Sequence, residues 1–435
     1  MKKKIRCSFT IVLAFLMFLS ACGTKGAEGS SGKSSSDEKK PSGALTGSVN
    51  LLQGYSKVEK EASETDPDFA KAYAGFSFKL FNSCAKTGGR ENMLLSPISV
   101  YYSLAILANG AAGNTKDELE QLLGLPTDRL NENLYAFAHA APSSDDQKMS
   151  IANSLWFRDD GSSLTMEPAF LQSVADWYDA ELYADPFDSG TMDRVNAWCL
   201  KNTDAMIDRI MSSPPADDEM FYLLNAVAFR GKWNTAYEDR QCLDHRFRNT
   251  DKSEKTVPML HSTEDIYLEN AELTGFIKPY RYHEFSFAAL LPRDENADIQ
   301  AFAESLSGEE FLSLLETQEY GSIVDVLLPE FTSECSLGLT DPLHELGLRN
   351  FFDGKADLSA MGHSALGELS MAGALQRTYI KLDRTGTEAA AVTAMTGAAT
   401  DIEPVQPKEV HLTRPFVYMI LHRDIPVFIG IVSSL

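Results

Sequence analysis

Hydrophobic positions recur at helical spacing in three stretches of the chain. The stretch 66–81 (DPDFAKAYAGFSFKLF) places its large apolar residues on one face and opens with an aspartate cap. The stretch 96–111 (SPISVYYSLAILANGA) begins at Ser96 and stops at an Asn-Gly pair, and 114–124 (NTKDELEQLLG) carries a capping box that starts at Thr115. The pattern predicts three amphipathic helices in this part of the chain.

Later in the chain the apolar residues form continuous short runs instead. Runs of this length, bounded by polar residues, are typical of strands that are buried on both faces. They lie at 221–229, 285–292, 324–331, 416–420 and 426–432. Helices early and strands late indicate an α+β architecture, with sheets covered by helices.

One segment near the C-terminus does not fit either pattern. Residues 378–383 (TYIKLD) alternate apolar and charged side chains, as a half-buried strand does. They run into 386–397 (GTEAAAVTAMTG), where alanine favours helix and no large side chain is present to anchor the segment. The sequence therefore places a conformationally undecided segment directly after a strand.

Composition and motifs narrow the functional classes. The chain has 435 residues, of which 44% are hydrophobic, and a net charge of -23 that argues against nucleic acid as a partner. No GxSxG, HExxH, GxGxxG or Walker motif occurs, and no histidine and cysteine cluster has metal-ligand spacing. We therefore expect a protein that is not an enzyme and uses no metal and no cofactor.

The N-terminus has the pattern of a targeting segment. A basic head precedes the apolar run 7–19, which is too short to span a bilayer comfortably, and the next residues, LSAC, resemble the lipobox of bacterial lipoproteins. We expect a signal peptide over 1–21, a lipid on Cys22 and a flexible linker over 22–65, because 23–43 lacks large apolar residues. The protein would then be anchored to the cell membrane outside the cytoplasm or released from it. The alternative is an ordinary secretory signal with an accidental cysteine.

Five further segments resemble those of the serpin family, in the same order along the chain. They are 94–115 (LLSPISVYYSLAILANGAAGNT), 195–207 (VNAWCLKNTDAMI), 223–237 (LLNAVAFRGKWNTAY), 386–393 (GTEAAAVT) and 412–420 (LTRPFVYMI). The fourth matches the serpin hinge motif at every position, whereas the second carries Asp204 where glycine is usual. The resemblance extends from about residue 66 to the end of the chain.

The serpin resemblance implies one domain over 66–435 with three sheets, about nine helices and an exposed reactive-centre loop. Length alone would have favoured two domains. In serpins a protease cuts this loop, which then inserts as a new strand into the main sheet. The resemblance implies an irreversible suicide-substrate inhibitor that forms a covalent complex with a serine-type protease, and we expect a monomer. A non-inhibitory serpin acting as an extracellular binding module is the alternative.

Side-chain alternation supports insertion of the hinge. If the segment from Gly386 onward becomes a strand, successive side chains point to opposite faces. One face then carries only small residues, Thr387, Ala389, Ala391 and Thr393, and the other carries Glu388, Ala390 and Val392. The small face can enter a packed sheet without overpacking, and the single charge stays on the face that water can reach.

The family's spacing also predicts the bond that the protease cuts. Counted from the hinge, it lies between Thr400 and Asp401, with Ala399 and Met395 as alternatives because the loop is longer than in typical serpins. No lysine, arginine or aromatic residue occurs from 386 to 407. Proteases with small specificity pockets, elastase-like or subtilisin-like, therefore fit best.

Residues that usually control insertion differ in two places. Arg384 stands where many serpins have a glutamate that ties the loop base to a neighbouring strand, so this ion pair would be absent or reversed. Gln376 stands where a histidine is usual beneath the sheet. It cannot titrate, but it can hydrogen-bond the partners that the resemblance implies, Asn225 and either Ser96 or Ser99. Trp233 resembles the tryptophan at the point where the loop enters the sheet.

Overall fold

The computed structural model describes residues 47–60, 65–87, 92–140, 144, 146–387 and 406–435. Ten α-helices occur in this part of the chain, close to the number expected. They are α1 (Pro67–Thr87), α2 (Pro97–Gly110), α3 (Gly113–Leu123), α4 (Thr127–Ala140), α5 (Pro168–Trp177), α6 (Thr191–Asn202), α7 (Ile299–Ser305), α8 (Gly308–Glu316), α9 (Thr340–Glu345) and α10 (Arg349–Phe352). The α+β prediction is confirmed.

The three helices expected from the pattern are present, but two of their caps differ from the prediction. Asp66 caps α1 as expected, since its Oδ1 accepts a hydrogen bond from the Phe69 amide at 2.8 Å. Ser96 precedes α2, but its hydroxyl donates to Val427 O at 2.9 Å instead of capping the helix. The capping box at Thr115 is wrong: α3 begins earlier, and the Thr115 hydroxyl accepts from the Asp357 amide at 2.8 Å. Tertiary contacts replaced local ones at both positions.

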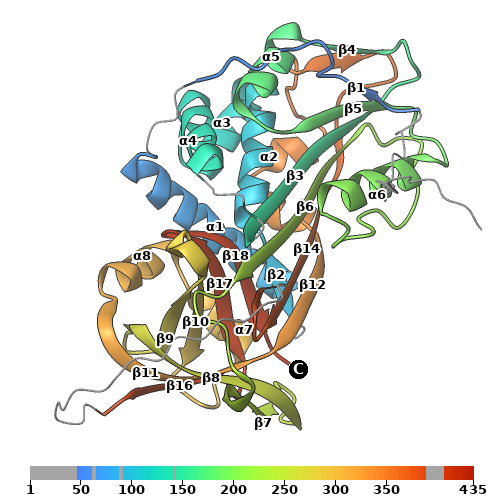
Figure 1. Ribbon diagram of the computed structural model, residues 1–435. Helices are drawn as coiled ribbons and strands as arrows, with labels where there is room; N and C mark the ends of the chain where they lie inside the picture. The colour runs from blue at the N-terminus through green and yellow to red at the C-terminus, as the bar shows by residue number, and fades with distance from the viewer. Residues whose placement is uncertain (1–46, 61–64, 88–91, 141–143, 145, 388–405) are drawn as a thin grey trace, which may run out of the picture. The chain divides into compact units, whose positions relative to one another are not determined.

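Seven of the described strands form the sheet that we call the main sheet (Figure 1). In spatial order they are β1 (Val49–Asn50), β5 (Glu181–Asp185), β3 (Gln147–Arg158), β6 (Phe221–Lys232), β15 (Gly386–Thr387), β14 (Met371–Asp383) and β12 (Phe331–Gly338). The central strands β6 and β14 come from distant parts of the chain and run parallel. The strand that the alternation at 378–383 predicted is the end of β14.

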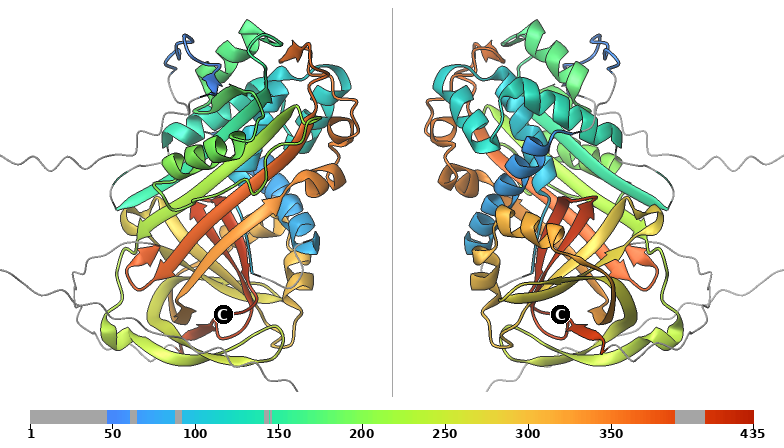
Figure 2. Two further views of the ribbon diagram at one scale, coloured as in Figure 1. Left: turned by 90° about the vertical axis from the view of Figure 1, so that its right-hand side faces the viewer. Right: turned by 90° about the vertical axis from the view of Figure 1, so that its left-hand side faces the viewer.

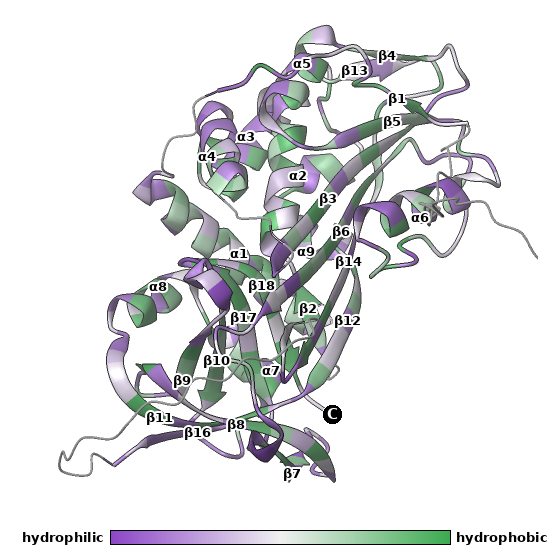
Figure 3. Ribbon diagram, viewed as in Figure 1, coloured by the Kyte–Doolittle hydropathy of each residue, from purple (hydrophilic) through white to green (hydrophobic). Residues whose placement is uncertain are grey.

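A second sheet packs with the main sheet and contains most of the apolar runs. Its path is β16 (Lys408–His411), β11 (Glu319–Pro329), β8 (Glu254–Glu269), β9 (Leu273–Pro279), β10 (Phe285–Pro292), β17 (Phe416–His422), β18 (Ile425–Val432) and β2 (Met93–Leu95), and β7 (Cys242–Arg248) pairs with β8. Figure 3 shows β10 and β17 as largely hydrophobic, and both strands are almost entirely buried. A small third sheet pairs β13 (Gly362–Ser364) with β4 (Leu164–Met166).

Helices cover both faces of the main sheet. On one face Trp198 and Val195 of α6 pack against Leu224 and Ala226 of β6. On the other face α2 lies against β3 and β6, and every residue of α2 except Asn109 is buried. The left view of Figure 2 shows the strands side by side, with α6 in front of them and α2 behind. Successive residues of β6 therefore enter two separate hydrophobic cores.

Residues 47–60 belong to the region for which the sequence predicts a linker, and they contact the folded domain. β1 pairs with β5, and the Ser48 hydroxyl donates to the buried carboxylate of Asp185 at 2.6 Å. Lys57 forms an ion pair with Asp179 at 2.9 Å. The boundary between the linker and the domain at residue 66 stays a prediction. Within the described residues, no helix is both long and apolar enough to cross a membrane.

Candidate functional site

The first two residues of the hinge already form a strand of the main sheet. β15 lies between β14 and β6, with Thr387 opposite Leu382 on one side and Gly231 on the other. Beyond this point β6 and β14 pair directly with each other, from Phe221 to Ala228 and from Met371 to Tyr379. The hinge therefore starts at one end of a seam between two strands, which is where an inserting strand would have to enter.

Two close contacts fix the hinge at this position. Gly386 has a φ of 148°, and a Cβ there would collide with the carbonyl oxygen of Gly231, so only glycine fits. The Thr387 side chain is fully buried, and its hydroxyl shares a hydrogen bond of 2.7 Å with the Tyr280 hydroxyl. Thr387 thus faces inward, as the alternation of small residues predicts. The other hinge residues, Glu388, Ala389, Ala390, Ala391, Val392 and Thr393, lie outside the described residues.

The residues proposed for the cut also lie outside the described part of the chain. These are Thr400 and Asp401, together with the alternatives Ala399 and Met395. Cys22 and the signal segment lie outside it as well. These assignments stay predictions.

Trp233 lies against the base of the loop. Its ring stacks on Tyr280 with centroids 4.5 Å apart, and its Nε1 donates to Asp383 O at 2.9 Å. Its backbone amide donates to Thr385 O at 3.1 Å. The sequence indicated Trp233 but missed Tyr280, which touches both Trp233 and Thr387. A tyrosine in the turn between β9 and β10 gave no signal by itself.

A buried ion pair, also missed from sequence, supports this aromatic group. Lys278 Nζ lies 2.7 Å from Glu264 Oε1, and both side chains are less than a tenth exposed. The ammonium lies 4.7 Å from the ring centre of Tyr237 and 5.4 Å from that of Trp233. Burial alone would lower the pKa of Lys278, but Tyr237 and Glu264 outweigh it and raise the pKa. The lysine therefore stays charged.

Arg384, which stands where many serpins have a glutamate, contacts two acidic residues. Its guanidinium pairs with Asp239, and its backbone amide donates to Glu330 Oε1 at 3.0 Å. Glu330 lies directly before β12, the strand beside β14. The loop base is thus tied to acidic partners, so the usual order of charges is reversed. Both members of the Arg384–Asp239 pair are more than half exposed, at 52% and 92%, which makes it a weak interaction.

Gln376 lies in the middle of β14 and connects to the start of α2. Its Oε1 accepts from the Ser96 amide at 2.8 Å, and its Nε2 donates to Ser96 O at 2.9 Å. The expected contact with Ser96 is therefore confirmed, through the backbone of Ser96. The expected hydrogen bond from Gln376 to Asn225 is not among those of the described chain, although the two residues are paired in register. The sequence did not reveal whether Gln376 would bond the hydroxyl or the backbone of Ser96.

Asn225 instead belongs to a neighbouring polar group beneath the sheet. Its Nδ2 donates to Ser103 Oγ at 2.7 Å and to Asn153 Oδ1 at 3.1 Å. The Ser99 hydroxyl donates to the same Asn153 oxygen at 2.6 Å. Ser99 and Asn225 thus meet through Asn153, a residue of β3 that the sequence reading missed. This group links α2 to both β3 and β6, on one side of the seam.

The chain returns from the loop into β16, which is held by a shared carboxylate. Asp325 of β11 accepts from His261 of β8 at 2.6 Å and contacts His411 of β16 at 2.8 Å, one oxygen for each ring. Burial alone would raise the pKa of Asp325, but these two hydrogen bonds outweigh it and hold the pKa below its ordinary value. The three strands are therefore joined by side chains as well as by backbone pairing.

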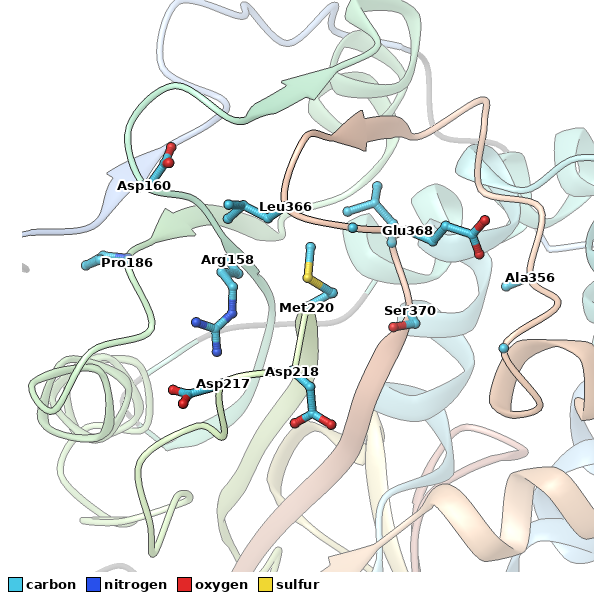
Figure 4. A pocket seen from close by; sticks show the side chains of 13 residues that line it. Arg158, Asp160, Pro186, Asp217, Asp218, Met220, Ala356, Leu366, Glu368 and Ser370 are labelled. Carbon is cyan, nitrogen blue, oxygen red and sulfur yellow. The ribbon is translucent and has the colours of Figure 1, made fainter.

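A cavity lies at the opposite end of the main sheet from the hinge (Figure 4). It has a volume of about 620 Å³ and lies where β6 and β14 begin. Acidic residues (Asp160, Asp217, Asp218 and Glu368), Arg158 and the apolar Leu366 and Met220 line it. Among the described residues no group of three histidine, cysteine or acidic side chains is arranged to hold a metal ion.

The described chain thus ends one segment in β15, between β14 and β6, and resumes in β16 of the second sheet. Comparison with known proteins identifies the family in which this arrangement occurs. The sequence matches the family described as "Serpin (serine protease inhibitor)" over residues 71–435. The chain belongs to the serpin family. Serpins are protease inhibitors and not enzymes, which confirms that prediction.

Individual relatives cover nearly the whole domain. The leukocyte elastase inhibitor of Bos taurus is 28% identical over 381 residues, which is 82% of this chain and 97% of the relative. The thermophilic serpin tengpin in its native state is 34% identical, with a TM-score of 0.84 over 89% of this chain and 100% of that structure. Its latent state gives a TM-score of 0.74 at 33% identity, over 86% and 100%. The relationship supports protease inhibition in general.

Proposed function

We propose that this protein is an irreversible suicide-substrate inhibitor of serine-type endopeptidases that acts by inserting its loop into the main sheet. The observation that carries the proposal is β15, because the hinge already pairs with both strands between which the loop would insert.

The register of β15 supports insertion of the small-residue face. In an antiparallel strand that continues β15, each later loop residue pairs one residue earlier on both β14 and β6. Ala391 then lies between Thr378 and Val227, which are fully buried and face the core behind the sheet. Ala390 lies between Ala228 and Tyr379, and Tyr379 packs on the opposite, α6 side. The positions of Ala391 and Ala390 in this register agree with the faces predicted from alternation alone.

The same register relates the predicted cut to the far end of the sheet. Continued in this way, the loop reaches Phe221 and Met371, the first residues of β6 and β14, at residues 397 and 398. Thr400 would then lie just beyond the end of the seam, beside the cavity of Figure 4. The seam can therefore accept most of the loop before the predicted bond, which supports a cut near Thr400–Asp401 as a proposal.

The mechanism is a race between two events. The protease attacks the loop and forms an acyl-enzyme, and insertion then carries the enzyme along the sheet and distorts its catalytic site before water completes the reaction. If insertion is faster than deacylation the protease is trapped, and otherwise the loop is merely cut. The native fold must therefore be held by kinetics and not by equilibrium.

The experiment mixes the soluble domain with a panel of elastase-like, subtilisin-like and trypsin-like proteases. We expect covalent complexes on denaturing gels with the first two classes and none with trypsin, because no basic residue lies between 386 and 407. The released C-terminal peptide, once sequenced, identifies the cut. The nicked protein should melt far above the intact one, since its loop becomes a central strand. A nicked protein that melts as before, with no complex formed, would instead support a non-inhibitory binding module.

We further propose that the protein is a bacterial lipoprotein, anchored through Cys22 outside the cytoplasm. The LSAC sequence after the apolar run supports this location. Cys22→Ser should release the protein or block its processing. Membrane fractionation is the measurement, and a processed Cys22→Ser protein that still sediments with membranes would overturn the anchor.

A further inference from the structure

We propose that Tyr320 and Ile323, on a bulge of β11, form a docking surface that contacts the target protease outside its active site while that site holds the loop. The proposal rests on the proposed inhibitory function and adds a second contact to it. We call these two residues and the loop between them the β11 bulge.

The β11 bulge projects from the second sheet. β11 pairs with β8 through Tyr320 and Ile266, and pairing resumes only at Val324 and Glu264. Three residues of β11 therefore lie opposite one residue of β8. Gly321, the first of the three, has a φ of 72°, and a Cβ there would have no atom within 4 Å. A left-handed glycine in open space makes the chain turn outward here.

The side chains at the bulge are apolar and exposed. Tyr320 is 71% exposed and Ile323 is 44% exposed. Within the described part of the chain the Tyr320 ring has no aromatic contact and its hydroxyl no hydrogen bond. Single exposed apolar residues are common on proteins, but here two stand within four residues of each other. Tyrosine is also enriched among the residues that dominate protein interfaces.

The position of the bulge identifies its partner. Val324, the residue directly after Ile323, pairs with Lys408, the first residue of β16. β16 is the strand in which the chain returns from the loop, and Figure 1 shows it alongside β11. A protease that holds the loop in its active site must therefore bring part of its surface next to the bulge.

The charges around the bulge indicate the character of that surface. Glu319 and Asp265 are exposed beside it. Lys408, which pairs with Val324 beside the bulge, forms an ion pair with Glu269 at 3.3 Å, so its charge is compensated. The chain as a whole carries a net charge of -23. An apolar contact with an acidic border fits a protease whose rim around the active site is basic, and this complementarity would also accelerate association.

The test compares three proteins: the unmutated domain, the double variant Tyr320→Ala/Ile323→Ala and the control Leu366→Ala. The exposed fraction of Leu366, 46%, is similar to that of Ile323, but Leu366 lies at the far end of the main sheet. The probe is a basic elastase in two forms, active and with its catalytic serine replaced by alanine. The active form reports the rate constant of covalent complex formation, and the inactive form reports the dissociation constant of docking. Melting temperatures confirm that all three proteins are folded.

We expect the double variant to bind the inactive elastase about tenfold more weakly and to form covalent complex correspondingly more slowly. The fraction of cut protein that ends in complex should stay unchanged, because the bulge lies outside the main sheet. The control should stay within about twofold of the unmutated protein.

The outcomes separate this proposal from the inhibitory function. Covalent complex with equal rates and affinities for all three proteins would overturn the docking surface and leave the inhibitor intact. Docking that depends on Tyr320 and Ile323 without any covalent complex would support the surface and overturn the trap. Neither docking nor complex would overturn both.

Discussion

Gln376 and Ser96 hold each other through two hydrogen bonds of opposite direction, which join the middle of β14 to the first turn of α2. A side-chain amide can satisfy one donor and one acceptor at the same time, and it stays uncharged at every pH. Because Gln376 is almost completely buried, neither group of Ser96 has water to replace it. The contact fixes the sheet at β14, a strand that would have to move aside in the proposed insertion.

Replacing Gln376 with alanine should destabilise the native domain by about 2–4 kcal/mol, because it leaves two buried backbone groups of Ser96 unsatisfied. The measurement is the free energy of unfolding in urea. Lys381→Ala on the same strand is the control, since its side chain is 46% exposed. Equal stability of the two variants would show that the Gln376 contact is dispensable.

The ion pair of Lys278 and Glu264 should be costly to break on one side only. Lys278→Met leaves a carboxylate buried without its cation, and we expect a loss of about 3–5 kcal/mol of unfolding free energy. The double variant Lys278→Met/Glu264→Leu should recover most of this loss, because it removes both charges. Unfolding free energies of the unmutated protein and the two variants test the pair. A double variant as unstable as the single one would contradict it.

The stability of the domain should fall as the pH drops from about 6.5 to 4. His422 lies between the rings of Phe137 and Phe285, and burial and the neighbouring Arg423 lower its pKa to about 4. Between pH 6.5 and 4, His422 is protonated in the unfolded chain but stays neutral in the native domain. Proton binding therefore stabilises the unfolded state relative to the native state. The contribution is about 3 kcal/mol across this window.

His422→Phe should flatten that dependence. The measurement is the melting temperature between pH 7 and 4, with the exposed His363→Phe as the control. A variant at position 422 that loses stability with falling pH as steeply as the unmutated domain would rule out this origin.

Arg384 should have little influence on insertion despite its reversed charge. Its partner Asp239 is almost fully exposed, and exposed pairs contribute less than about 1 kcal/mol. We expect Arg384→Ala to leave the fraction of protease trapped within about twofold of normal. Gels of complex and cleaved protein measure it, and a large change would show that the pair controls the entry of the loop.

The sequence predicted the elements better than their contacts. The helical spacing of 66–81 and 96–111 and the apolar runs of the second sheet identified α1, α2, β10, β17 and β18, because burial imposes a period on the residues that supply it. The inward position of Thr387 followed from the same alternation. The hinge motif was visible because it is contiguous.

The partners of these residues could not be predicted in the same way. Tyr280, Asn153 and Lys278 reach the site from segments far away in sequence, and a single polar residue in an apolar run does not reveal which group it will meet. Ser96 and Thr115 had local roles available as helix caps, and both were taken by tertiary partners. The alternation of residues predicts which face of a strand a side chain is on, whereas the residue that it contacts there depends on the whole fold.

The measurement that tests loop insertion most directly compares Ala391→Arg with Ala390→Arg against the same small-residue protease. In the register of β15, an arginine at 391 must enter the core beside Thr378 and Val227, where an unpaired charge is penalised by several kcal/mol. Even about 3 kcal/mol on the insertion barrier slows it more than a hundredfold, so deacylation wins.

The readout is the ratio of covalent complex to cleaved protein on denaturing gels. We predict that Ala391→Arg gives almost only cleaved protein, whereas Ala390→Arg, on the opposite face of the strand, stays close to the unmutated inhibitor. Equal ratios for both variants, each like that of the unmutated protein, would contradict insertion in this register and the inhibitory mechanism with it.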